Sequence, residues 1–184
     1  IKNARNVGRY IFGSGSVAEL TDLVQARKGN TPGAAVFLVD SFFETNMDYL
    51  GNLPLEKSDL MRYVSIDEEP TTESIDSLVE EIASEVIMPS VIVGIGGGIT
   101  LDTAKAVSNL LTNGGKATDY QGWDLVKVPG VYKIGIPTLS GTGAEATRTC
   151  VMTNKTTGLK LGMNSDYTVF DQLILDPTLT ATVP

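Results

Sequence analysis

Three consecutive glycines between an apolar run and a helix-like segment carry the clearest chemical signal in the sequence. Residues 91–105 read VIVGIGGGITLDTAK, so Gly96, Gly97 and Gly98 follow a run typical of a buried strand. Glycines let the backbone approach a phosphate closely, and the N–H groups at the start of a helix point towards it. The alternative is a tight turn that binds nothing, but this context favours phosphate binding.

A carboxylate ends another apolar run of strand length. Residues 34–39 read AAVFLV, and Asp40 follows, at the sheet edge where ligands bind in open α/β folds. There Asp40 could accept hydrogen bonds from the hydroxyls of an adenosine ribose, and it would repel a 2′-phosphate, which favours NAD over NADP. A helix cap is an equally good interpretation. Asp40 precedes Gly94 by 54 positions, so the order is not that of the common dinucleotide fingerprint, whose acid follows the glycines by about 20 residues.

A second loop supplies hydroxyl groups after a predicted strand. Residues 136–145 read IPTLSGTGAE, which places Thr138, Ser140 and Thr142 among glycines. These neutral donors could lie beside a pyrophosphate. The alternative is a loop whose hydroxyls only cap neighbouring backbone.

Two charged residues are open to a functional and a structural interpretation. Asp102 lies four residues after Gly98, where it either complements the helix dipole or faces the nicotinamide or substrate end of a cofactor. Lys160 lies on the second arm of a predicted hairpin. It could offer a cation to a phosphate or ribose, although a solvated strand lysine is the better interpretation from the sequence alone.

Strands that alternate with helices must position these residues. Ser16 to Glu19 has the spacing of a capping box, and Thr71 or Thr72 can cap a later helix. We predict strands at 7–12, 34–39, 61–66, 91–93, 134–136 and 173–175, helices at 16–27, 45–52, 72–86 and 100–111, and a hairpin with arms at 147–153 and 159–163. This order indicates an α/β fold with a doubly wound, mostly parallel, Rossmann-like sheet and an added β-hairpin.

Composition narrows the classes of protein. The chain has 184 residues, about one domain, and 42% of them are hydrophobic, enough for a sizeable core. A net charge of −8 argues against a nucleic-acid partner. A single cysteine and no histidine leave no Cys or His metal cluster. We find neither a run of membrane-spanning length nor a signal-peptide pattern, and expect a cytoplasmic protein.

The segments together resemble the iron-containing (group III) alcohol dehydrogenases and their glycerol dehydrogenase relatives, with dehydroquinate synthase more distant. The resemblance covers essentially the whole chain in family order, through the segments at 6–16, 69–71, 96–105, 137–145 and 175–179. It implies that residues 1–184 form a dinucleotide-binding N-terminal domain, and that an all-helical C-terminal metal domain is missing from this chain.

The resemblance also implies which residues contact NAD. Asp40 would hold the adenosine ribose, and Gly96, Gly97 and Gly98 would cradle the pyrophosphate. Glu69 departs from the neutral residue common at its position, and an acid there would weaken phosphate contacts. The remaining implied cofactor residues are Asp102, Thr138, Ser140, Thr142, Thr147, Thr149, Lys160 and Leu179.

The implied activity is oxidation of an alcohol, polyol or sugar hydroxyl by a homodimeric enzyme. A divalent iron or zinc, held by one Asp and two or three His outside this chain, would polarise the substrate oxygen, and the nicotinamide would take the hydride. This chain would then contain no catalytic residue and no metal ligand. Residues 140–150 look most like the branch that oxidises 3-deoxy-D-manno-octulosonate at C8.

Two alternatives to an oxidoreductase stay open. A lyase like dehydroquinate synthase would use the same NAD site but regenerate the cofactor, so NADH would not accumulate. A stand-alone nucleotide-binding module would have no catalysis at all.

Overall fold

A parallel sheet organises the described part of the chain. The computed structural model describes residues 6–181, so Ile1 and Pro184, the ends of the predicted domain, lie outside the described residues. Within them, a six-stranded sheet has the order β1-β9-β6-β4-β2-β3, and all its pairings are parallel. Its strands are β1 (Arg9–Phe12), β2 (Ala35–Asp40), β3 (Leu60–Val64), β4 (Val91–Gly96), β6 (Lys133–Pro137) and β9 (Gln172–Leu175). The predicted doubly wound sheet is confirmed.

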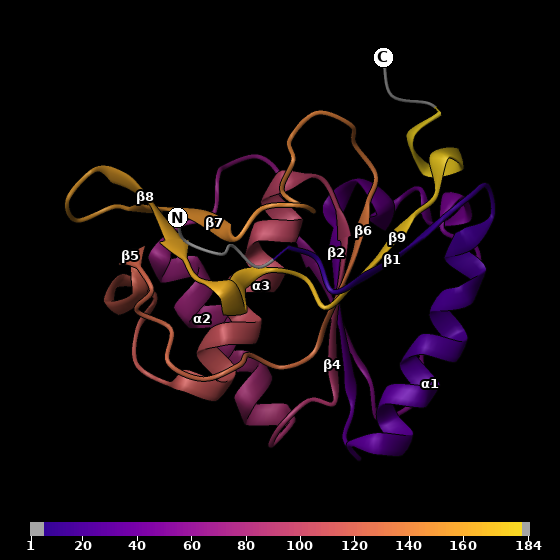
Figure 1. The fold of residues 1–184 in the computed structure, drawn as a ribbon, viewed down its shortest axis with the longest axis horizontal. Helices are drawn as coiled ribbons and strands as arrows, with labels where there is room; N and C mark the ends of the chain where they lie inside the picture. The colour runs from indigo at the N-terminus through magenta and orange to yellow at the C-terminus, as the bar shows by residue number, and fades with distance from the viewer. Residues whose placement is uncertain (1–5, 182–184) are drawn as a thin grey trace.

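Helices cover both faces of this sheet (Figure 1), with α1 (Leu20–Asn30) on one face and α2 (Thr72–Glu85) and α3 (Gly98–Asn113) on the other. Phe37 of β2 packs in one apolar cluster with Leu20 of α1. Its neighbour Leu38 packs in a second cluster with Leu101 of α3. Because successive side chains of a strand point to opposite faces, a strand covered on both sides must be apolar at every position.

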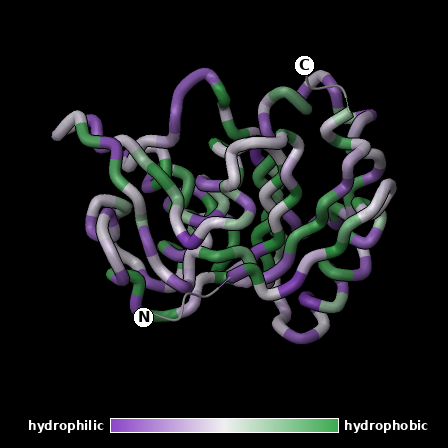
Figure 2. Tube along the Cα trace, turned by 45° about the horizontal axis from the view of Figure 1, so that its top comes forward, coloured by the Kyte–Doolittle hydropathy of each residue, from purple (hydrophilic) through white to green (hydrophobic). Residues whose placement is uncertain are grey.

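Figure 2 shows the result as hydrophobic strands through the middle of the molecule and mostly hydrophilic segments around them. All six residues of β2 and all six of β4 are buried. Full burial of a large aliphatic side chain contributes roughly 1.5–3 kcal/mol. These strands therefore give the sheet a rigid centre, and their carboxyl ends are fixed in position.

A small second sheet carries the predicted hairpin. The arms β7 (Thr149–Asn154) and β8 (Leu159–Asn164) pair antiparallel, and β5 (Gly122–Trp123) lies parallel to β8. The Asn154 carboxamide accepts hydrogen bonds from two amides of the turn, and Gly158 takes a φ of 70°. The hairpin prediction is confirmed, whereas β5, only two residues long, has no sequence pattern to predict it.

The strand order reverses between β2 and β4. From β2 the chain passes to β3 on one side and then returns to β4 on the other. Ligands of open α/β sheets bind at such a switch point, beyond the carboxyl ends of the strands. Asp40 ends β2 and Gly96 ends β4, so the two predicted elements lie on neighbouring strands despite their separation in the sequence.

The start of the first helical segment differs from the prediction. Ser16–Glu19 is a 3₁₀ turn, its N-cap is Gly15, and the Ser16 hydroxyl is buried without a partner among the described residues. The Asp176 carboxylate accepts the hydrogen bonds of the Gly15 and Val17 amides instead, at 3.1 and 3.0 Å. The predicted capping box is therefore wrong, because a distant carboxylate provides the cap.

The helix predicted at 45–52 is also wrong. Two 3₁₀ turns, Ser41–Glu44 and Met47–Tyr49, occupy this region. The Asn46 side chain donates to the Phe42 carbonyl at 2.8 Å and separates the turns. Further 3₁₀ turns are Ala117–Tyr120, Asp166–Thr168 and Pro177–Thr180. Over residues 6–181, every helix is too short or too polar to cross a lipid bilayer.

Replacement of Asp176 should test the long-range cap. Asp176 is 2% exposed and also accepts from the Thr178 amide and hydroxyl. Burial raises the pKa of Asp176, but its hydrogen bonds with Thr178, Val17 and Gly15 outweigh burial and hold the pKa below the ordinary 3.8. Asp176→Asn should lower the free energy of unfolding at pH 7 by about 2 kcal/mol, as expected for hydrogen bonds to a charged group.

Urea titrations at several pH values measure this effect. A lowered folded-state pKa stabilises the protein above about pH 4 and loses that contribution as the pH falls through the folded value, so the difference between wild type and variant should shrink in acid. Asp48→Asn is the control, because Asp48 is exposed. Equal urea midpoints for wild type and Asp176→Asn at pH 7 would contradict the proposed cap.

Candidate functional site

The N-terminus of α3 is open at the switch point. Gly97 is its N-cap and offers no side chain, and the amides of Gly98, Ile99 and Thr100 donate no hydrogen bond to the described residues. The neighbouring α2 differs, because Thr71 and Ser74 cap it reciprocally, each at 3.0 Å. Free amides at the positive end of a helix dipole form a site for an anion.

Close packing explains the first of the three glycines. Gly96 has a φ of 156°, and a Cβ atom there would lie 2.7 Å from the Cβ of Asp40 and 2.9 Å from the Cβ of Thr100. The Thr100 hydroxyl is buried against Gly96 without a hydrogen-bond partner among the described residues. Gly96 therefore lets Asp40 and the first turn of α3 come together.

The other two glycines face the loop after β6. A Cβ atom at Gly97 would lie 2.6 Å from the Leu139 Cδ1, and one at Gly98 would lie 3.3 Å from the Thr142 Cβ. The Thr138 amide donates to the Gly96 carbonyl at 3.0 Å. Sequence reasoning thus placed the glycines and the hydroxyl loop in one region, and the structure brings them together.

Asp40 uses one carboxylate oxygen to cap a turn, and its other oxygen accepts no hydrogen bond from the described residues. It is 5% exposed, and its Oδ1 accepts the Phe42 amide at 2.8 Å, which caps the 3₁₀ turn that follows β2. Its Oδ2 accepts no hydrogen bond within residues 6–181. The cap predicted as an alternative is confirmed, and an acceptor is left for a ligand beside Gly96.

Hydroxyls of the loop after β6 divide into two groups. Ser140 and Thr142 are exposed. The Thr147 hydroxyl instead accepts from Lys105 at 3.2 Å, and the Thr149 carbonyl accepts from the same ammonium at 2.8 Å. The predicted roles of Thr147 and Thr149 at a cofactor stay predictions, since both lie against α3.

Asp102 also lies against the hairpin. Its Oδ2 accepts the Val151 amide at 3.0 Å, and its Oδ1 lies 3.7 Å from the Lys105 ammonium. Burial raises the pKa of Asp102 and lowers that of Lys105. Sequence reasoning missed Lys105, although a lysine three positions after Asp102, among alanines, valine and leucine on one helix, was the available signal.

Lys160 contacts the loop between β3 and α2. It forms an ion pair with Glu69, and Lys155 forms another with Glu68 at 3.3 Å. The negative charge of Glu69 is therefore matched by a cation of the hairpin. Leu179 lies in the turn Pro177–Thr180, where it is 8% exposed within the core cluster on the α1 side.

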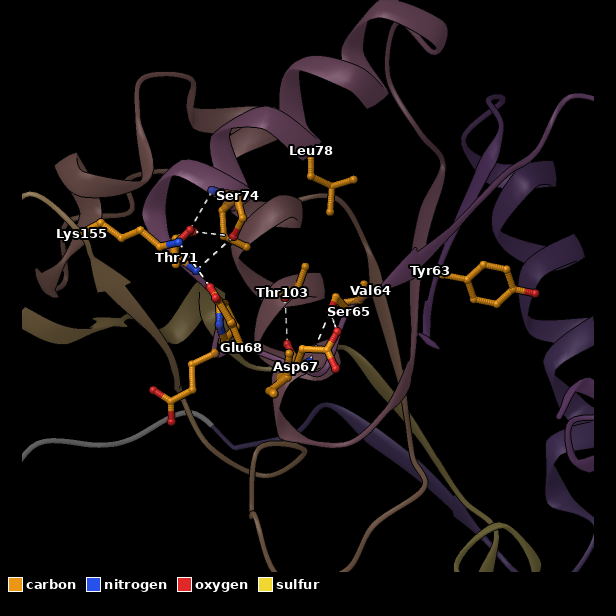
Figure 3. A pocket seen from close by; sticks show the side chains of 14 residues that line it. Tyr63, Val64, Ser65, Asp67, Glu68, Thr71, Ser74, Leu78, Thr103 and Lys155 are labelled. Atoms are coloured by element: carbon orange, nitrogen blue, oxygen red, sulfur yellow. Dashed lines mark hydrogen bonds and ion pairs between the residues drawn. The ribbon is translucent and has the colours of Figure 1, made fainter. Parts of the chain in front are cut away.

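Two pockets are lined by elements around the glycine turn, although neither includes the three glycines or Asp40. The first, of about 440 Å³, lies between the β3–α2 loop and the first turns of α2 and α3, and includes Ile99 and Thr103. Figure 3 shows Lys155, Thr71 and Ser74 to one side of Thr103 and Val64 and Ser65 to the other, with the Glu68 carboxylate directed away from Leu78. The second, of about 220 Å³, includes Leu139 and Ser140.

No group of three or more metal-binding side chains is found among residues 6–181. This agrees with the absence of histidine from the sequence. The site can thus hold an anion and a hydroxylated sugar, but these residues supply no metal centre.

Comparison with known proteins decides the family. The family model described as "Iron-containing alcohol dehydrogenase" matches residues 8–177. The chain belongs to the iron-containing alcohol dehydrogenase family. The sulfoacetaldehyde reductase of Bilophila wadsworthia is 34% identical over 97% of this chain, and the NAD-dependent methanol dehydrogenase of Bacillus methanolicus is 38% identical over 50% of it.

Solved structures of other proteins share the fold. An alcohol dehydrogenase from Oenococcus oeni has a TM-score of 0.82 and 26% identity, over all of this chain and 48% of its own. The sulfoacetaldehyde reductase from Bifidobacterium kashiwanohense, solved in complex with NAD⁺, has a TM-score of 0.78 and 23% identity, with the same coverage. The chain spans 46% of the Bilophila protein and so about half the length of these relatives.

Cys150 should report whether α3 and β7 stay packed. It is 0% exposed, and burial raises the pKa of its thiol, which disfavours the reactive thiolate. We expect a disulfide reagent such as 5,5′-dithiobis(2-nitrobenzoic acid) to react on the order of a hundredfold more slowly in native buffer than in urea. Cys150 is the only cysteine of the 184 residues, so the chain gives one signal. Equal rates in both conditions would refute this packing.

Proposed function

We propose that this chain forms the NAD-binding half of a metal-dependent enzyme that interconverts an alcohol and a carbonyl compound. The observation that carries the proposal is the set of unbonded amides at Gly98, Ile99 and Thr100, next to the free oxygen of Asp40. Membership of the family supports the oxidoreductase class.

The residues present fit a dinucleotide. The amides at the start of α3 would bind the diphosphate, and Gly97 and Gly98 leave the backbone bare for its approach. Ser140 and Thr142 would add neutral donors without a second charge. The free oxygen of Asp40 would accept hydrogen bonds from a ribose and would repel a 2′-phosphate, which supports NAD over NADP.

The bound nicotinamide supplies the hydride acceptor for the alcohol carbon. In this proposal the chain binds and orients that cofactor. Its glycine turn follows β4, which packs beside β2, and every residue of both strands is buried, so the turn has a fixed position. Lys160 is already paired with Glu69, so any contact of Lys160 with the cofactor would compete with that pair.

The metal of the family does not fit the described residues. They contain no suitable cluster, and we therefore derive no step of the reaction from them through a metal. We propose instead that iron or zinc is held in the helical C-terminal domain expected from the resemblance. We also propose a cytoplasmic homodimer with a small-molecule substrate and no nucleic-acid partner.

The substrate class follows from the relatives at a coarse level. Their names include sulfoacetaldehyde reductase, methanol dehydrogenase and 1-propanol dehydrogenase. A small alcohol or aldehyde is therefore our general proposal. The loop sequence at 140–150 supports a narrower candidate, the C8 hydroxyl of 3-deoxy-D-manno-octulosonate, and a panel of both substrate types with the full-length protein distinguishes them.

Two substitutions at Asp40 separate its roles in binding and capping. Asp40→Ala and Asp40→Ser should each raise the dissociation constant of NAD by about tenfold to a hundredfold, because each removes charge-assisted hydrogen bonds to the ribose. Asp40→Ser keeps an oxygen that can accept the Phe42 amide, so it should retain more stability than Asp40→Ala. Isothermal titration calorimetry and urea titration of the full-length protein measure the two effects.

The same variants address cofactor preference. Loss of the carboxylate should improve the affinity for NADP relative to NAD. Unchanged affinity for NAD in both variants would remove Asp40 from the site, and an absence of NAD binding in the wild type would refute the proposed function.

Removal of the metal should separate binding from turnover. After treatment with a chelator, the full-length protein should lose activity but bind NAD with the same dissociation constant, because none of the proposed contacts uses a metal. Activity should return when Fe²⁺ or Zn²⁺ is added back. A chelated protein that turns over at the original rate would contradict the metal-dependent class.

A further inference from the structure

A buried ammonium lies beneath the end of the loop that joins β6 to β7. Lys105 is 0% exposed, and its Nζ donates to the Thr147 and Thr149 carbonyls at 3.1 and 2.8 Å and to the Thr147 hydroxyl at 3.2 Å. A lysine has three N–H donors, and these contacts use all three. Asp102 lies 3.7 Å away, and Phe170 presents its ring at 5.5 Å.

Stability alone does not explain a lysine at this place. Burial of a charge is costly, and an apolar side chain of similar volume is often as stable or more stable. A methionine would fill the same space but could not accept or donate any of these hydrogen bonds. All three hydrogen bonds of Lys105 go to one short segment, residues 147–149.

This segment anchors the returning end of the loop. At the start of the loop, the Thr138 amide donates to the Gly96 carbonyl. At its end, Lys105 binds the backbone at Thr147 and Thr149. Between the anchors, Ser140 and Thr142 are exposed, and the loop contains Gly141 and Gly143 with φ of 115° and 68°. Ala144 packs in the core cluster on the α3 side, and Arg148 pairs with Asp124 and Asp166, so Lys105 acts together with these contacts at the returning end of the loop.

We propose that Lys105 is a positioning residue, which ties the returning end of loop 138–148 to α3 and so holds the Ser140 and Thr142 hydroxyls beside the free amides of that helix. The effect of Lys105 on the order of the loop does not depend on a ligand. The expected effect on the affinity for NAD rests on the proposed function. Lys105 itself contacts no ligand and acts only through the loop.

Hydrogen exchange without nucleotide tests the loop directly. In the full-length protein, Lys105→Met should raise the exchange rates of amides 138–149 by about tenfold or more, as expected when hydrogen bonds to a charge are lost, and leave those of α1 unchanged. The dissociation constant of NAD should rise by a similar factor. Ser108→Ala is the matched control. Ser108 is also buried on α3, but its hydroxyl donates to the Val131 carbonyl, away from this loop.

The outcomes are distinct. A rise in exchange that is equal over the loop and α1, or the same pattern in Ser108→Ala, would show that Lys105 only supports the fold, and would overturn the proposal. If Lys105→Met does not fold, Thr147→Val removes the hydroxyl that accepts from Lys105, together with its long contacts to the Ala144 and Thr149 carbonyls at 3.5 and 3.3 Å, and should give the same loop-confined effect at smaller size. Exchange unchanged there would also overturn the proposal. If the wild type does not bind NAD, the proposed function fails while the exchange comparison still decides the role of Lys105.

Discussion

The first turn of α3 carries backbone amides that no described side chain satisfies, and the rest of the site is arranged around them. A helix end without partners is unfavourable unless water or a ligand takes their place. The protein has the means to close such an end, since α2 is capped by Thr71 and Ser74. At α3 the cap position is Gly97, and the sheet reverses its order at the same point. An open helix end thus coincides with the place where the topology leaves a crevice.

The position of these amides is set deep in the core. Most of the α3 side chains from Thr100 to Leu110 are buried, and polar groups among them bind the neighbouring elements. Asp102 accepts the Val151 amide, Ser108 donates to the Val131 carbonyl, and Asn109 donates to the Thr168 hydroxyl. Directional bonds of this kind fix the rotation and height of a helix more narrowly than apolar contacts do. The proposed anion site is therefore held in place by hydrogen bonds between α3 and the elements packed around it.

Sequence reasoning found the features that are local. Apolar runs gave β2 and β4, and the glycine cluster gave the start of α3, because each pattern reflects its own segment. It failed where a distant residue determines the local structure. Asp176 caps Gly15 across 161 positions, and Lys105 binds carbonyls 42 and 44 positions away. No spacing within a segment could indicate these partners. The turns at 41–49 were missed for a different reason: the Asp40 cap and the Asn46 side chain act within the segment and favour two short turns over a continuous helix.

The three neighbouring glycines differ in how closely other atoms surround them, so they differ in how readily each could be replaced. At Gly96 any side chain meets Asp40 and Thr100, so the fold itself excludes substitution. At Gly97 a methyl group meets only the flexible tip of Leu139, and at Gly98 it meets Thr142 at 3.3 Å. If the proposed ligand ceased to matter, side chains at Gly97 and Gly98 would be tolerated sooner than one at Gly96. A protein that kept only the glycine at the end of β4 would then have retained the fold without the proposed binding of a ligand.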